Sequence, residues 1–265
     1  MTEAEWLASE DPQAMLERHH RAPDRKLRLF ACACCRLAWD CVPLGYHRRL
    51  VDVCEQFVDG GVGAGIIDLV RRRAQSEQPP RDGIAQAPDA ALATVHPIAW
   101  VAARDALRTI TTATCKRAVI TASVNKPDLS SPVSVAAVQA WQEDWTRSEA
   151  WSTSGKVPWN DRHREAAQAA EQIAHLTARR LFASALRCVF FSTFRLVELD
   201  PTFRTVTVVA IARQMYASRD FSAMPILADA LQEEGCDSDD VLSHCRGPGP
   251  HARGCWVVDR VLGKE

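Results

Sequence analysis

The stretch from residue 25 to residue 41 constrains the fold more than any other, because it is apolar around most of its circumference when drawn as a helix. One stripe at helical spacing comprises Leu27, Phe30, Cys34, Leu37 and Cys41. A second stripe comprises Cys32, Cys35 and Trp39. A helix that is apolar on most sides is buried. We therefore predict a central helix, capped by Asp24, with other helices packed around it.

The rest of the chain repeats the helical pattern in segments separated by Pro and Gly. Further helices are predicted over residues 3–8 (capped by Thr2), from Pro12, and over 46–58, 66–75, 97–124, 134–151, 160–191, 206–218 (capped by Thr205), 221–234, 238–245 and 255–262. Only residues 189–199 have an extended character. The prediction is an all-α fold of about ten helices in one compact domain, residues 1–265. A HEAT-like arrangement of helical pairs and a subdivision into 1–128 and 129–265 stay open.

Charge and hydropathy exclude several classes of protein. The 265 residues carry 32 Lys and Arg against 33 Asp and Glu, and this balance argues against a dedicated nucleic-acid or membrane-surface binder. No apolar run reaches the roughly 18 residues of a membrane span. The acidic start, Met1 to Trp6, has no apolar core of a secretory signal. These features predict a cytosolic protein.

Ten cysteines are a high number for such a chain. Without a secretory signal we expect them to be reduced thiols, metal ligands or redox groups rather than disulfides. The one CxxC spacing, Cys32 and Cys35, lies inside the predicted central helix, so the classical zinc pattern of two CxxC pairs is absent. Cys32, Cys34 and Cys35 would spread their sulfur atoms around a helix axis, so we interpret them as buried thiols.

The densest group of chemically able side chains lies near the C-terminus, from His244 to Trp256, around a Gly/Pro turn. His244, Cys245, His251 and Cys255 offer enough nitrogen and sulfur ligands for zinc. The neighbours His244 and Cys245 would point in different directions, however, and their spacing from Cys255 matches no common zinc knuckle.

Two other interpretations of this turn stay open. Cys255 could be a thiolate nucleophile, with His251 or His244 as its base and Asp259 as the group that orients the base. Alternatively, the turn is a clasp that seats the last helix, with Cys255 and Trp256 docked on the core. The clasp is the interpretation that we favour at this point, and it predicts that His251 and Cys255 are buried and bonded to neighbouring backbone.

Two further groups point to partners. Trp141, Trp145 and Trp151 lie close together, and Trp is enriched where proteins bind one another. Basic residues could form a stripe for nucleic acid if folding brought them together: Arg71, Arg72, Arg73, Lys116, Arg117, Arg179 and Arg180.

Three stretches resemble an uncharacterised family of paralogous proteins in planctomycete bacteria. They are residues 1–13, residues 25–36, and the C-terminal part from Asp200-Pro201 through residues 207–210 and 225–231 to residues 244–256. The match covers both ends of the chain and leaves out about residues 60–160. The resemblance implies a bacterial cytosolic protein and carries over no activity and no catalytic residue.

The leading hypothesis is a non-enzymatic, all-α interaction or regulatory module whose partner is another protein. The alternatives are an enzyme or zinc-dependent accessory centred on the C-terminal His/Cys turn, and an accessory subunit of a nucleic-acid-processing complex of a defence type.

Overall fold

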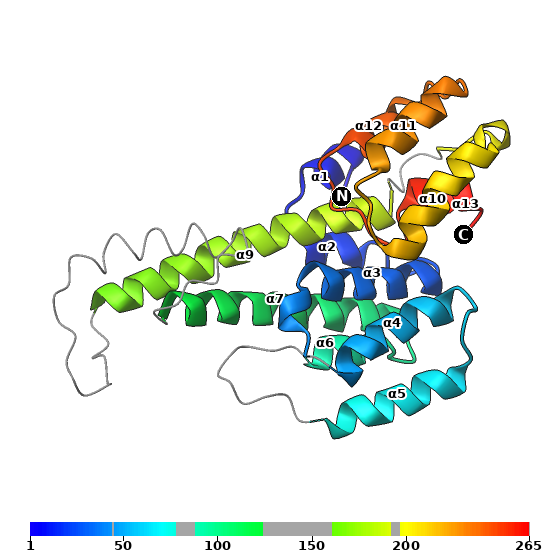
Figure 1. Ribbon diagram of the computed structural model, residues 1–265. Helices are drawn as coiled ribbons and strands as arrows, with labels where there is room; N and C mark the ends of the chain where they lie inside the picture. The colour runs from blue at the N-terminus through cyan, green and yellow to red at the C-terminus, as the bar shows by residue number, and fades with distance from the viewer. Residues whose placement is uncertain (44, 78–87, 124–160, 192–196, 265) are drawn as a thin grey trace.

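The computed structural model describes residues 1–43, 45–77, 88–123, 161–191 and 197–264. These residues form α-helices joined by short turns and contain no strand, so the predicted all-α fold is confirmed (Figure 1). The α-helices are α1 (Glu3–Ala8), α2 (Pro12–Glu17), α3 (Asp24–Leu37), α4 (Tyr46–Val58), α5 (Ala64–Ser76), α6 (Pro88–Ala93), α7 (Ala99–Ser123), α9 (Asp161–Val189), α10 (Val206–Ser218), α11 (Met224–Glu233), α12 (Asp239–Arg246) and α13 (Trp256–Leu262). Two short 3₁₀ turns, η1 (Trp39–Cys41) and η2 (Pro201–Phe203), complete them. No helix of the described ranges combines the length and apolar character needed to cross a bilayer.

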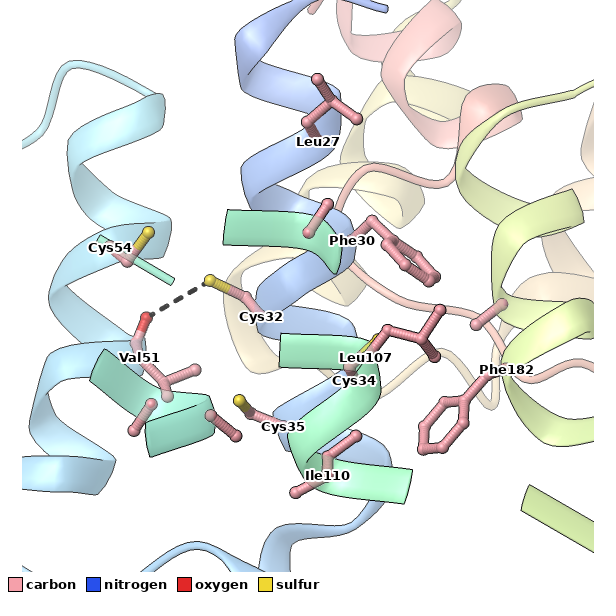
Figure 2. Packing of buried hydrophobic residues seen from close by; sticks show 14 of the residues in the cluster. Leu27, Phe30, Cys32, Cys34, Cys35, Val51, Cys54, Leu107, Ile110 and Phe182 are labelled. Carbon is pink, nitrogen blue, oxygen red and sulfur yellow. Dashed lines mark hydrogen bonds between the residues drawn. The ribbon is translucent and has the colours of Figure 1, made fainter. Parts of the chain in front are cut away.

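Helix α3 is the centre that the sequence predicts. It packs against α4, α7 and α9, and its residues from Leu29 to Cys35 are all buried. Figure 2 shows Phe30 on the side of Phe182 and Cys32 pointing towards α4. The long helices α7 and α9 pack against each other beside it.

The buried side chains form two main clusters. The larger one joins α1 to α7 with α9, and the smaller one joins α10 to α13, which we call the C-terminal unit, with Cys188 of α9. Helix α9 therefore packs mainly with the N-terminal helices. The subdivision at residues 128 and 129 stays a prediction, because residues 124–160 lie outside the described ranges, and so does the HEAT-like arrangement.

Capping residues set several of the helix boundaries as the sequence predicts. Thr2 forms a capping box with Glu5 at the start of α1, and the Thr205 hydroxyl accepts a hydrogen bond from the Val208 amide at the start of α10. The extended character predicted for residues 189–199 does not give a strand in its described residues: Val189 ends α9, and residues 197–199 are irregular.

The predicted limits of the central helix need correction. Pro23, not Asp24, is the N-cap of α3, and the α-helix ends at Leu37, before the 3₁₀ turn of Trp39–Cys41. The guanidinium of Arg48 donates hydrogen bonds to the carbonyls of Trp39 and Val42 and lies over the Trp39 ring. These contacts satisfy carbonyl groups that a continued helix would have bonded internally.

A buried carboxylate fastens the C-terminal unit to α3. Asp259 of α13 is 2% exposed, and its Oδ2 accepts from Arg25 Nη1 at 2.7 Å and from Lys26 Nζ at 2.6 Å. Lys26 Nζ also donates to the Gly254 carbonyl at 2.8 Å. A buried charge needs such partners. These bonds fix the start of α13 over the central helix.

Candidate metal centre

The loop between α12 and α13 lies directly on the central helix. Gly254 has φ +91°, and a Cβ at this position would come within 3.0 Å of the Leu29 Cβ. Both facts require glycine, because L side chains rarely adopt this conformation and the neighbouring helix leaves no room. The close approach places Cys255, the N-cap residue of α13, deep in the molecule, where its amide donates to the Ala252 carbonyl.

Four side chains from different elements converge at this point. Cys188 comes from the last turn of α9, His244 from α12, His251 from the loop and Cys255 from the start of α13. One potential ligand atom from each lies within 4.8 Å of all the others. His244 Nε2 is 3.2 Å from Cys255 Sγ, and His251 Nδ1 is 3.7 Å from Cys188 Sγ.

Burial and neighbouring groups set the ionisation of the two thiols. Cys255 is fully buried and Cys188 is 2% exposed. Burial opposes ionisation of Cys255, but the hydrogen bond from Cys188 and the interaction with His244 outweigh it and hold the pKa of Cys255 well below its usual value. The bond to Cys255, together with burial, raises the pKa of Cys188. The two thiols are coupled, and their contact favours ionisation of Cys255 over ionisation of Cys188.

Ring contacts orient the imidazoles. The rings of His244 and His251 meet edge to face, with centroids 4.9 Å apart, and the His244 ring also contacts Trp256 at 5.3 Å. His251 Nε2 is buried and has no hydrogen-bond partner among the described residues. Ring packing and the contact of one ring nitrogen with a thiol thus hold each imidazole in place.

The donor set fits a metal ion. Two thiolates and two imidazoles at one point are the ligand set of structural zinc sites, and four such donors complete a tetrahedral sphere. The group therefore could hold a metal.

Most of the residues predicted for a metal come together, with one exchange. His244, His251 and Cys255 belong to the group, whereas Cys245 does not. Adjacent residues of a helix point in different directions, so Cys245 points away from the group that His244 joins. Its side chain is buried within the C-terminal unit instead. Cys188, which the sequence analysis did not single out, completes the group. No local signal marks it, since it is a lone cysteine at the apolar end of a long helix.

The clasp and nucleophile interpretations fare differently. Cys255 is buried as the clasp requires, but His251 is only partly buried. The side chain of His251 contacts the Cys188 thiol, and that of Cys255 contacts the His244 ring, so among the described residues neither side chain is bonded to backbone as the clasp predicts. The Asp259 carboxylate binds Arg25 and Lys26. Because these partners occupy it, it is not placed to orient a histidine base.

The structure does not support the other two predicted sites. Trp141, Trp145 and Trp151 lie outside the described residues. Basic residues that were predicted to form a stripe are in several cases paired with acidic neighbours: Arg71 with Asp68, Arg179 with Asp11, and Arg180 with Glu10.

Comparisons with known proteins found no relative of this chain. No protein-family model matches the chain, and neither a search of curated proteins nor a search of solved structures found a match.

Proposed function

We propose that this chain is a non-enzymatic helical interaction module of a bacterial cytosol, in which a zinc ion fastens the C-terminal unit to helix α9. The observation that carries the proposal is the convergence of Cys188, His244, His251 and Cys255, with ligand atoms within 4.8 Å of one another. The partner that we propose is another protein, as the sequence analysis predicts.

Two properties of the group support a structural ion rather than a catalytic one. Catalytic zinc sites keep a coordination position open for water or substrate, whereas four protein ligands close the sphere. Both sulfur atoms also belong to buried residues, which argues against direct contact with a substrate.

The position of the group supports its role in holding the fold. Cys188 ends α9, which packs mainly with the N-terminal helices, and the other three ligands belong to the C-terminal unit. An ion at this point would connect parts of the chain that are 56 or more residues apart in sequence, which is the distance from Cys188 to His244. Its binding energy would then become folding energy.

A cobalt-substituted protein tests whether the site is closed. Replacing zinc by Co²⁺ should give the visible spectrum of a tetrahedral site with two thiolates, and added azide or imidazole should leave that spectrum unchanged. A spectrum that shifts with azide would show an open position and contradict the structural role. A Cys245→Ala chain is the matched control, because it removes a buried thiol of the same unit that is not in the group.

A thiolate enzyme is the second candidate, and one observation favours it. His244 Nε2 lies 3.2 Å from Cys255 Sγ, which is a geometry suited to a base and its nucleophile. Burial of Cys255 argues against it. Iodoacetamide at neutral pH separates the two proposals: the module predicts that Cys255 of the chain as purified reacts no faster than the other thiols, and faster reaction would favour the enzyme.

A further inference from the structure

A cleft of about 330 Å³ lies where the C-terminal unit meets α3 and α4. One wall comes from α3 and η1, and the other comes from the segment after α10 and from the loop that carries His251. Small-molecule sites often lie at such junctions, and this volume is at the lower end of their range. We call it the junction cleft.

Three arginines line the junction cleft around one buried carboxylate. Glu55 of α4 is 2% exposed, and its two oxygens accept from Arg36 Nε and Nη2, each at 3.0 Å, and from Arg219 Nε at 2.6 Å. Arg253 Nη1 lies 3.6 Å from the same carboxylate, while its Nε donates to the Tyr216 carbonyl. Glu55 thus gathers three guanidinium groups that arrive from three separate segments.

The arginines of the junction cleft outnumber the carboxylates that pair with them. Asp52 pairs with Arg36 and Arg219, so that two carboxylates face three guanidinium groups and one positive charge is left over. Among the described residues, Arg36 donates hydrogen bonds from Nε and Nη2, and Arg219 donates one from Nε while its Nη2 lies 3.4 Å from Asp52 Oδ1. Within the same described ranges, Nη1 makes no hydrogen bond in either residue. Guanidinium groups held in this way are prepared to bind a carboxylate or phosphate with little further ordering.

Apart from His251, the rest of the lining is apolar. Leu29, Ala33 and Leu37 contribute from α3, and Phe221 faces them from the C-terminal unit. Trp39 closes one end, with the Arg36 guanidinium 4.3 Å from its ring centroid. A ligand that fills the cleft must therefore carry an apolar body as well as a negative charge.

We propose that the junction cleft binds a small organic carboxylate with an apolar or aromatic body, whose carboxylate meets Arg36 and Arg219 and whose body packs on Phe221 and Leu37. The inference goes beyond the proposed function and does not require the metal ion, although His251 contributes to both places.

Direct titration of the full chain, as purified, tests this proposal on the unaltered protein. Calorimetry with 3-phenylpropionate should show saturable binding with a Kd on the order of 1 mM, given the small size of the probe. The neutral 3-phenylpropanamide should bind at least about tenfold more weakly, because it cannot form charge-assisted hydrogen bonds. Equal binding of acid and amide, no binding of the acid, or tighter binding of inorganic phosphate would each overturn the assignment.

A pair of variants locates the site. Arg219→Gln should weaken 3-phenylpropionate binding at least about tenfold. Arg246→Gln, which removes an arginine paired with Asp229 away from the cleft, should leave it unchanged. If Arg219→Gln does not fold, a crystal of the unaltered chain with 3-(4-bromophenyl)propionate decides the matter. Bromine in the junction cleft supports the proposal, and bromine elsewhere refutes it.

Discussion

Cysteines gather at two places in this molecule, and the two places differ in what surrounds the sulfur atoms. Cys32, Cys34 and Cys35 of α3 belong with Cys54 of α4 to the larger buried cluster, whereas Cys188 and Cys255 meet at the edge of the C-terminal unit. All are buried. The number of thiols is higher at the first place, yet only the second has the geometry of a metal centre among the described residues.

The partners of the thiols account for this difference. Around α3, Cys54 Sγ donates to the Thr94 carbonyl at 3.2 Å and Cys32 Sγ lies 3.9 Å from the Val51 carbonyl (Figure 2). Burial raises the pKa of Cys34. At the second place, imidazoles from His244 and His251 face the sulfur atoms. Thiol density thus marks a core, and convergence of thiol with imidazole marks a candidate metal centre.

Removing Cys188 should have the largest effect on this contrast. Cys188→Ala takes away one of four ligands, so we expect the chain to lose stoichiometric zinc. Where free zinc exceeds the Kd about a thousandfold, losing the bound ion costs about 4 kcal/mol of unfolding free energy. Metal analysis after gel filtration and thermal unfolding measure both effects.

Cys245→Ala is the matched control for Cys188→Ala. Both residues are buried cysteines of the smaller cluster, but only Cys188 is in the group of four. The control should keep its zinc and lose only the packing of one sulfur atom. Loss of zinc from Cys245→Ala, or its retention by Cys188→Ala, would contradict the ligand set.

The ion pairs of Asp259 should contribute to the same junction independently of the metal. Asp259→Asn leaves Arg25 and Lys26 without their shared buried carboxylate, and breaking such a pair costs about 3–5 kcal/mol. Urea unfolding in the presence of chelator measures this contribution. Asp229→Asn, at a carboxylate that is 67% exposed, should cost less than about 1 kcal/mol. Equal small costs would mean that these ion pairs do not fasten α13.

A third test concerns His19, a buried histidine that packs on aromatic rings, in contrast to His244 and His251, which contact cysteine thiols. His19 stacks on Phe190, and burial, with a smaller contribution from Arg18, lowers its pKa from 6.5 to about 4. Above pH 6.5 the residue is neutral in both states. As the pH falls from 6.5 to 4, the unfolded chain takes up a proton that the folded chain does not, so His19 costs up to about 3 kcal/mol of stability.

His19→Phe should remove this cost. The variant should lose less stability than the unaltered chain when urea unfolding is repeated between pH 6.5 and pH 4. Because the metal group is the same in both proteins, its own acid sensitivity cancels in the difference. Parallel pH profiles would show that His19 is protonated in the folded state.

The smallest effect should come from the thiols of the central helix. Cys34→Ala leaves a small cavity and should cost about 1 kcal/mol, with zinc content unchanged. Thermal unfolding and metal analysis of this variant complete the comparison. A change in zinc content would mean that the thiols around α3 also bind metal.

The sequence was sufficient for the helical framework because its signals are local. Thr2 and Thr205 cap helices where predicted, and the apolar stripes of residues 25–41 identify α3 as the central helix. The end of α3 was misplaced by a few residues, because the contacts of Arg48 with Trp39 and Val42 form only in the folded chain.

The candidate metal centre could be predicted only in part, since one ligand is brought in by tertiary packing. His244, His251 and Cys255 share one short segment, and their residue types made zinc one of three open interpretations, of which the clasp was favoured. Cys188 is 63 residues away from His251, and nothing near it in the sequence distinguishes it from the other buried thiols. The same limit hid the ion pairs of Asp259, whose partners lie more than 200 residues away.

Zinc content of the purified full chain tests the central claim most directly. We predict one zinc ion per chain after gel filtration, and a melting temperature that falls when a chelator removes the ion and recovers when zinc alone is added back. A chain that carries no zinc, binds none when zinc is supplied, and melts at the same temperature with and without chelator would contradict the account.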